Sequence, residues 1–226
     1  MKASQMRSKN SPAALGDLSD LRNKHRGKKC FVVGSGPSLF LDDKNIEPIQ
    51  KHIVISVNAS ILLMKNWRFS PFVLARAKRN GRKPPTKADS RFWISNDVMC
   101  IWWDYFWHDV VHADCTRIVR TSWQGKQARF WKYGFRYFRP RRGGVNQSID
   151  PEDGGLCWSS SVPTGIDLGL LMGCDVYLLG VDHTFEEKTH FWQYWPDNEQ
   201  PKFAGGKRHT PNPSEVSKFF NDNMIV

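Results

Sequence analysis

Residues 28–38, KKCFVVGSGPS, decide the fold, because a short apolar run leads directly into a glycine-rich turn. The run at 30–33 is typical of a buried parallel strand, and residues 34–38 form the turn. Glycine has no Cβ, so the backbone N–H groups of such a turn can approach a phosphate closely. The turn lacks the third glycine of the dinucleotide fingerprint and the Gly-Lys-Ser/Thr ending of a P-loop. A tight strand-to-loop turn without a ligand is therefore the alternative.

A second strand is predicted at residues 52–57, HIVISV, and it is followed by Asn58 and a helix-compatible run at 61–67. Its β-branched, apolar composition favours a central parallel strand. Ligands of open α/β sheets bind at the carboxyl ends of strands, which makes Asn58 a candidate ligand contact. Asparagine is equally favoured as a helix N-cap, so both interpretations stand.

A helix is predicted over residues 166–172, preceded by hydroxyl side chains that include Ser160 and Ser161. These serines are good N-cap residues, Pro163 suits a first helical turn, and Gly173 fits the position after the helix end. The helix start is therefore well defined by the sequence.

A third buried strand is predicted at residues 175–181, and it ends in Asp182 and His183. Three strand ends would then carry polar groups to one crevice, which favours a nucleotide site. The segments together predict an α/β fold, a Rossmann-like parallel sheet with helices on both faces.

The composition limits the classes of protein that the chain can represent. Five scattered cysteines without a C-x-x-C pair argue against a disulfide framework or a zinc site. No apolar stretch approaches the roughly 20 residues that span a bilayer, so we expect a cytoplasmic protein without a membrane span. The net charge of +11 predicts attraction to polyanions.

The 226 residues suit one sizeable domain. We expect a flexible basic tail at residues 1–16 and a single Rossmann-like transferase domain at 17–226, with a basic, aromatic-rich insertion or lid around 117–155. The apolar end at 223–226 resembles the start of a strand, so we expect a further C-terminal part or a second subunit that completes the sheet edge.

Residues 117–142 have the most unusual composition, with nine Lys or Arg, seven aromatic rings and no acid. Cations that bind phosphates and flat rings that stack on bases are the chemistry of single-strand or flipped-base binding. Arg129, Trp131 and Arg136 are the candidate nucleic-acid contacts. The alternative is an insertion whose rings pack on the domain while its cations reach water.

Three histidines crowd the last quarter of the chain: His183, His190 and His209. Their spacing does not match a helix-borne zinc site, so no metal site is predicted. A neutral imidazole has a pKa suited to a general base, which makes one of them a candidate catalytic residue. A surface histidine in a loop is the alternative for each.

Three of these segments resemble a known family: FVVGSGPSL at 31–39, ISVNAS at 55–60 and SSSVPTGIDLGLLMGCDVYLLGVDH at 159–183. They resemble the core of the family 42 glycosyltransferases, which are bacterial sialyltransferases. They resemble equally the domain-of-unknown-function 115 proteins, with motility accessory factors and the archaeal 6-hydroxymethylpterin pyrophosphokinase. The resemblance covers residues 28–66 and 158–191, and the sialyltransferases have asparagine where this chain has Ser35.

The resemblance implies a nucleotide site built from the turn, the strand ends and the helix start. Its residues here are Gly34, Ser35, Gly36, Pro37, Ser38, Asn58, Ser160, Ser161, Asp182 and His183. It also implies metal-independent inverting transfer, with His209 as the general base by spacing and His190 as the alternative.

Three hypotheses for function follow. The first is a transferase that uses a nucleotide-activated donor, most simply a glycosyltransferase with a nucleotide sugar and a hydroxyl acceptor. The acceptor could be a hydroxymethylated base in nucleic acid, as in DNA modification. The second is a pyrophosphokinase that uses ATP and a small hydroxymethyl compound. The third is a noncatalytic nucleic-acid-binding module, and each could be a homo-oligomer.

Overall fold

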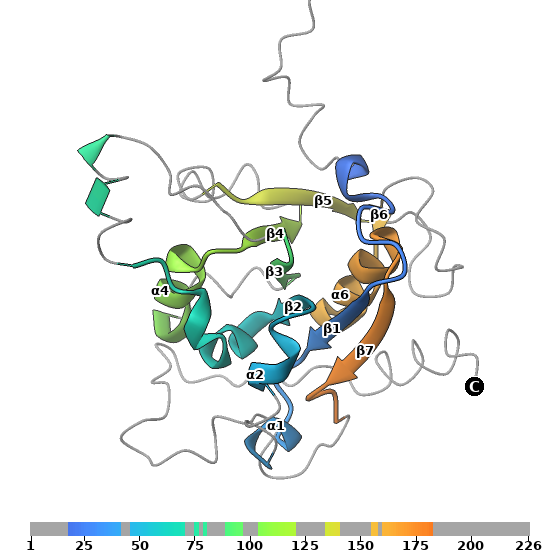
Figure 1. Ribbon diagram of the computed structural model, residues 1–226, viewed down its shortest axis with the longest axis horizontal. Coiled ribbons are helices and arrows are strands. Elements are labelled where there is room, and N and C mark those ends of the chain that lie inside the picture. Colours follow the sequence, from blue (N-terminus) through green and yellow to red (C-terminus); the bar gives the residue numbers. More distant parts are fainter. Residues whose placement is uncertain are drawn as a thin grey trace, which may run out of the picture.

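The computed structural model describes residues 18–41, 46–70, 75–76, 79–80, 89–96, 104–120, 134–140, 155–157 and 160–182. Within these ranges, parallel strands form one sheet in the order β6-β5-β4-β3-β2-β1-β7 (Figure 1). The strands are β1 (Lys29–Val33), β2 (Ile53–Val57), β3 (Arg91–Ser95), β4 (Thr116–Arg120), β5 (Arg136–Pro140), β6 (Gly155–Leu156) and β7 (Asp175–Leu179). The predicted α/β fold is confirmed.

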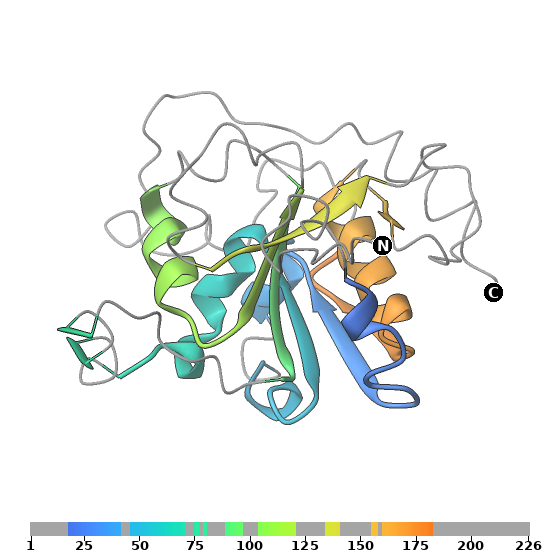
Figure 2. The ribbon, with the colours of Figure 1, turned by 90° about the horizontal axis from the view of Figure 1, so that it is seen from above.

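Helices cover both faces of the sheet. They are η2 (Ser19–Leu21), α1 (Ser38–Leu41), α2 (Ile46–Ile49), η4 (Asn58–Leu63), η5 (Lys65–Trp67), α4 (Asp104–His112) and α6 (Ser161–Leu171). Figure 2 shows α4 (green) on one side of the strands and α6 (orange) on the other. Of the helices in the described ranges, none combines the length and the apolar character needed to cross a membrane.

The nearly continuous apolar sequence of β2 is explained by burial of the strand on both faces. All five of its residues are buried. Val54 packs with Val33 and Trp93 in the core cluster on the α4 side. Ile55 and its neighbours two positions away pack in the second cluster, which includes side chains of α6. Both faces of a central parallel strand are covered, so alternation with polar residues disappears.

The direction of winding reverses once in the sheet. From β1 to β6 each strand is added on the same side of the previous one, whereas β7 returns to the free side of β1. Crossovers between parallel strands are right-handed in almost all proteins, so a reversal of direction moves the connecting helix to the opposite face. This explains why α6 packs against β1, β2, β3 and β7 on the face opposite α4, and it places the switch point between β1 and β7.

Part of the predicted insertion around 117–155 belongs to the sheet. Most of β4 and all of β5 lie in this segment, and the two strands pair in parallel. The residues between them, 121–133, and those at 141–154 lie outside the described residues, as do the predicted tail at 1–16 and the chain end at 223–226.

The remaining local expectations differ only in detail. Helix α6 begins at Ser161, with Ser160 as its N-cap residue and Pro163 in its first turn as expected, and Gly173 has φ of +75°, the left-handed conformation expected after a helix end. The helix-compatible run at 61–67 forms the end of η4 and then η5.

Candidate functional site

The carboxyl end of β1 is bound to the carboxyl end of β7. Gly34 N donates a hydrogen bond to Leu179 O at 2.8 Å, and Gly36 N donates one to Gly180 O at 2.8 Å. These two N–H groups were expected to be available to a phosphate, and in the structure both donate to backbone oxygens of the β7 segment. The glycine turn (residues 34–38) continues the pairing of β1 with β7 beyond the strands.

The glycines of the turn are needed for this close approach. A Cβ on Gly34 would lie 2.4 Å from Gly180 O, and a Cβ on Gly36 would lie 2.2 Å from Asp182 Oδ2. Real Cβ atoms do not come this close to other heavy atoms, so any side chain would push β7 away. The fold itself therefore requires glycine at both positions.

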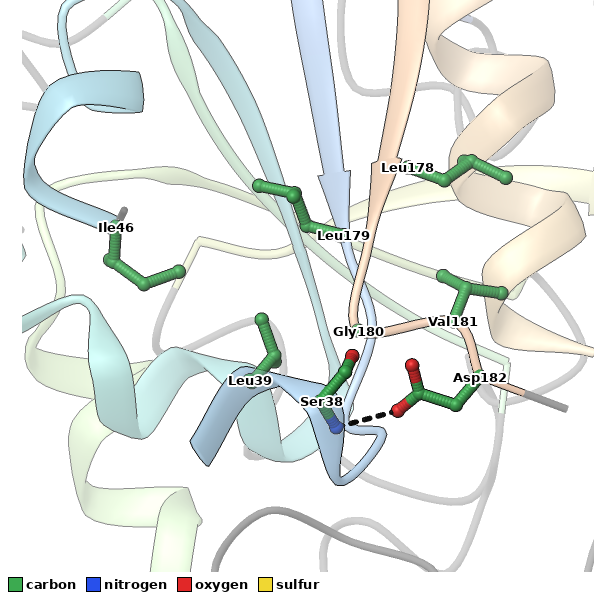
Figure 3. A pocket seen from close by; sticks show the side chains of 8 residues that line it. All are labelled: Ser38, Leu39, Ile46, Leu178, Leu179, Gly180, Val181 and Asp182. Atoms are coloured by element: carbon green, nitrogen blue, oxygen red, sulfur yellow. Dashed lines mark hydrogen bonds between the residues drawn. The ribbon is translucent and has the colours of Figure 1, made fainter. Parts of the chain in front are cut away.

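A carboxylate occupies the beginning of α1. Asp182 Oδ2 accepts a hydrogen bond from Ser38 N at 2.8 Å (Figure 3). Pro37 has no N–H to offer. A cavity of about 200 Å³ lies beside this contact. It is lined by Ser38, Leu39, Ile46, Leu178, Leu179, Gly180, Val181 and Asp182.

The carboxyl end of β2 is built with polar side chains. Asn58 has φ of +51°, and its backbone oxygen accepts a hydrogen bond from Trp93 Nε1 at 2.9 Å. Its side-chain oxygen is buried and has no hydrogen-bond partner among the described residues. Ser35 Oγ donates to Val57 O at 3.3 Å, which joins the glycine turn to this strand end. Asn58 thus begins η4 and still offers an unused acceptor.

The hydroxyl group of Ser60 links the ends of β1 and β2. Its Oγ accepts a hydrogen bond from Val57 N at 2.8 Å and lies 2.8 Å from Val33 O and from Ser56 Oγ. The side chain is fully buried. Ser60 was not predicted to link the two strands. The available signal was a serine two positions after Asn58, the residue that follows β2.

The end of β3 meets the beginning of α6. Asn96 N donates to Ser161 Oγ at 2.8 Å, so the hydroxyl of Ser161 ties the two elements together. Ser160 is the N-cap residue, and within the described part of the chain its hydroxyl makes no capping hydrogen bond. Asn96 is a further strand-end residue that was not predicted, and its signal was the polar pair Ser95-Asn96 after the apolar stretch 92–94.

The predicted site residues therefore divide into two groups. The turn residues, Asn58, Ser160, Ser161 and Asp182 lie at the ends of neighbouring strands or at the start of α6. His183, His190, His209, Arg129 and Trp131 lie outside the described residues. No group of three or more His, Cys, Asp or Glu side chains within the described ranges is arranged to hold a metal ion.

Two arginines of the basic segment are engaged within the protein. Arg136, a predicted nucleic-acid contact, lies in β5 and donates from Nη1 to Asp20 Oδ2 at 3.0 Å. Arg117 is only 7% exposed, and its Nε donates to Val110 O at 2.7 Å at the end of α4. Burial lowers the pKa of the Arg117 guanidinium from its ordinary value. Arg117 is thus a helix-capping residue and is not available to a phosphate backbone.

Compared with protein-family models, with curated proteins and with solved structures, the chain matches none of them.

Proposed function

We propose that this protein is a transferase that binds a nucleotide-activated donor at the carboxyl edge of β1, β2, β3 and β7. The observation that carries the proposal is the coincidence of the winding reversal with clustered polar groups. The switch point between β1 and β7 is the place where open α/β sheets bind their ligands. Ser35, Asn58 and Ser161 lie on the strand ends or helix start next to that point.

Each element has a distinct role in the proposed complex. The hydroxyl of Ser35 and the unused oxygen of Asn58 orient the nucleotide. The N-terminus of α6, with Ser160 and Ser161, favours the negative charge of the phosphate, because helix dipoles and free N–H groups attract anions. This charge stabilisation would replace a metal ion.

The proposed reaction is inverting glycosyl transfer. The oxygen of an acceptor hydroxyl attacks the anomeric carbon of the donor sugar while the bond from that carbon to the phosphate oxygen breaks. A histidine removes the acceptor proton, and the nucleotide phosphate leaves with the bonding electrons. His209 is the proposed base and His190 the alternative, both on the resemblance to the family 42 glycosyltransferases.

A ligand panel tests the donor class. Thermal denaturation is measured with nucleoside diphosphate sugars, cytidine monophosphate sugars, ATP and an oligonucleotide. A ligand at 100 times its Kd stabilises a protein by about 2.7 kcal/mol, which a melt detects readily. Stabilisation by a nucleotide sugar supports the proposal. Stabilisation by ATP alone favours a pyrophosphokinase, and stabilisation by the oligonucleotide alone favours a binding module.

Turnover of the responding donor tests the base. The variant His209→Ala should lose about 10² to 10⁴ in turnover while donor affinity is kept, as expected of a general base. His190→Ala is the matched control. Loss of turnover only in the His190 variant would move the role to that residue.

A further inference from the structure

The contact between the glycine turn and the end of β7 decides which part of a nucleotide can lie there. Gly36 N is bonded to Gly180 O, and Ser38 N is bonded to the carboxylate of Asp182. Figure 3 shows this carboxylate directly beside the first residue of α1. A phosphate at the same place would have to share or replace these bonds.

Charge argues against a phosphate beside Asp182. Like charges separated by a few ångströms repel, and the repulsion grows where water is partly excluded. Oδ2 of Asp182 lies 2.8 Å from Ser38 N, so a phosphate oxygen bonded to that N–H would meet a carboxylate oxygen. The position that carries the strongest sequence signal for a phosphate is therefore electrostatically unsuited to one.

The same carboxylate is suited to a ligand that donates hydrogen bonds. A carboxylate has only acceptor sites, about four in two oxygens, and Ser38 N is bonded to Oδ2 alone. Hydroxyl groups of a ribose are donors of this kind, and acidic residues at strand ends of dinucleotide-binding folds accept from ribose hydroxyls.

The neighbouring cavity has a lining that is partly apolar and partly polar. Its volume is about 200 Å³, and Leu39, Ile46 and Leu179 contribute apolar walls on the α1 and α2 side of β7 (Figure 3). Small-molecule sites combine such walls with a few placed polar groups, and here Asp182 and Ser38 are the polar groups. A mixed lining of this kind, with a carboxylate as acceptor, suits an uncharged ring that bears hydroxyl groups.

We propose that the cavity beside Asp182 takes the nucleoside end of the donor, with the Asp182 carboxylate accepting hydrogen bonds from ribose hydroxyls, and that the glycine turn holds no phosphate. This inference rests on the proposed nucleotide-dependent function. Asp182 is then a residue that determines specificity for ribose.

Calorimetric titration in the presence of a chelator tests the proposal. The probes are uridine, cytidine, adenosine and guanosine, their 2′,3′-dideoxy counterparts and their 5′-diphosphates. The protein variants are wild type, Asp182→Asn and the matched control Asp175→Asn, an exposed aspartate at the opposite end of β7. Asparagine keeps an oxygen that can accept from Ser38 N, and a melt of each variant verifies folding.

The expected result is a loss confined to the ribose contact. Wild type should bind its preferred ribonucleoside about tenfold or more tightly than the dideoxy form. Asp182→Asn should weaken the ribonucleoside and its diphosphate by about 10- to 100-fold and remove the preference for ribose, as expected for a hydrogen bond to a charged group. Asp175→Asn should bind like wild type.

Two outcomes would overturn the inference while the proposed function stands. One is tighter binding of the diphosphate by Asp182→Asn with nucleoside affinity unchanged, since that places the phosphate at the turn. The other is a wild-type protein that binds nucleotides without any preference for ribose over dideoxyribose, a result that does not depend on how the variant folds. If wild type binds none of the probes, the proposed function and the inference both fail.

Discussion

The ends of β1 and β2 border the same crevice, yet they are built in opposite ways. At the end of β1 the chain packs backbone against backbone, and Gly34 and Gly36 leave no space for a side chain. At the end of β2 the side-chain oxygen of Asn58 is buried without a hydrogen-bond partner among the described residues, and Ser60 fixes the backbone next to it. The first end is closed by the protein itself, whereas the second retains hydrogen-bonding capacity for a ligand.

The largest expected effect tests the closed end. Gly34→Ala should lower the free energy of unfolding by about 3 kcal/mol, because the new Cβ would lie 2.4 Å from a backbone oxygen that cannot move alone. Gly27→Ala is the control. Its φ of +70° makes alanine cost about 1 kcal/mol, although, among the described residues other than its two chain neighbours, none has an atom within 4 Å of a Cβ placed there. Urea denaturation of both variants measures the difference, and equal costs would remove close packing as the reason for Gly34.

The next largest effect is expected for Ser60, whose hydroxyl holds the end of β2. Ser60→Ala should cost about 2 kcal/mol, because the buried N–H of Val57 would lose its acceptor. Ser56→Ala should cost less, since Ser56 Oγ contacts the hydroxyl of Ser60 and an alanine there leaves the Val57 bond intact. The same urea titration applies. A larger loss from Ser56→Ala would show that Ser60 does not carry the junction.

The third effect concerns ligand affinity. Asn58→Gly keeps the left-handed backbone but removes the amide, so nucleotide affinity should fall about tenfold while stability changes by less than about 0.5 kcal/mol. Asn58→Ala should also lose about 1 kcal/mol of stability through backbone strain. Calorimetry and a melt separate the two properties. Unchanged affinity in Asn58→Gly would show that the unused oxygen does not serve the ligand.

The smallest effect distinguishes the two serines at the start of α6. Ser161→Ala should cost about 1 kcal/mol of stability, because Asn96 N donates to the Ser161 hydroxyl. Ser160→Ala should change stability by less than about 0.5 kcal/mol and lower nucleotide affinity instead. A thermal melt with and without nucleotide reports both. Reversed roles would place Ser160 in the scaffold and Ser161 at the ligand.

The strands next to the switch point could be predicted from sequence because each is an apolar run that ends in glycine, asparagine or aspartate. Strands β4 and β5 could not, because Arg117 and Arg136 interrupt the apolar pattern. Arg117 donates to a backbone carbonyl at the end of α4, and Arg136 pairs with Asp20, which is 116 positions away. Such partners are visible only in the folded chain.

The sequence indicated which residues lie at the strand ends, but not what their backbone contacts. The strand ends at Gly34, Asn58 and Asp182 do lie at the carboxyl edge of adjacent strands. The phosphate role of the turn rested on its glycines, whose backbone packing against Gly180 depends on a strand far away in the sequence. The glycines of a turn indicate that its backbone packs closely against another group. They do not indicate whether that group is a ligand or another strand of the protein.

The late arrival of β7 has a consequence for the chain during its synthesis. Ser38 and Asp182 are 144 positions apart, so the partner of the glycine turn leaves the ribosome long after the turn itself. At 5–20 residues per second this delay is about 7 to 30 s. During that interval β1 can already pair with β2 while its other side presents unpaired backbone groups, a ready template for wrong partners. This side of β1 therefore stays without its native partner until β7 has been synthesised and can pair with it.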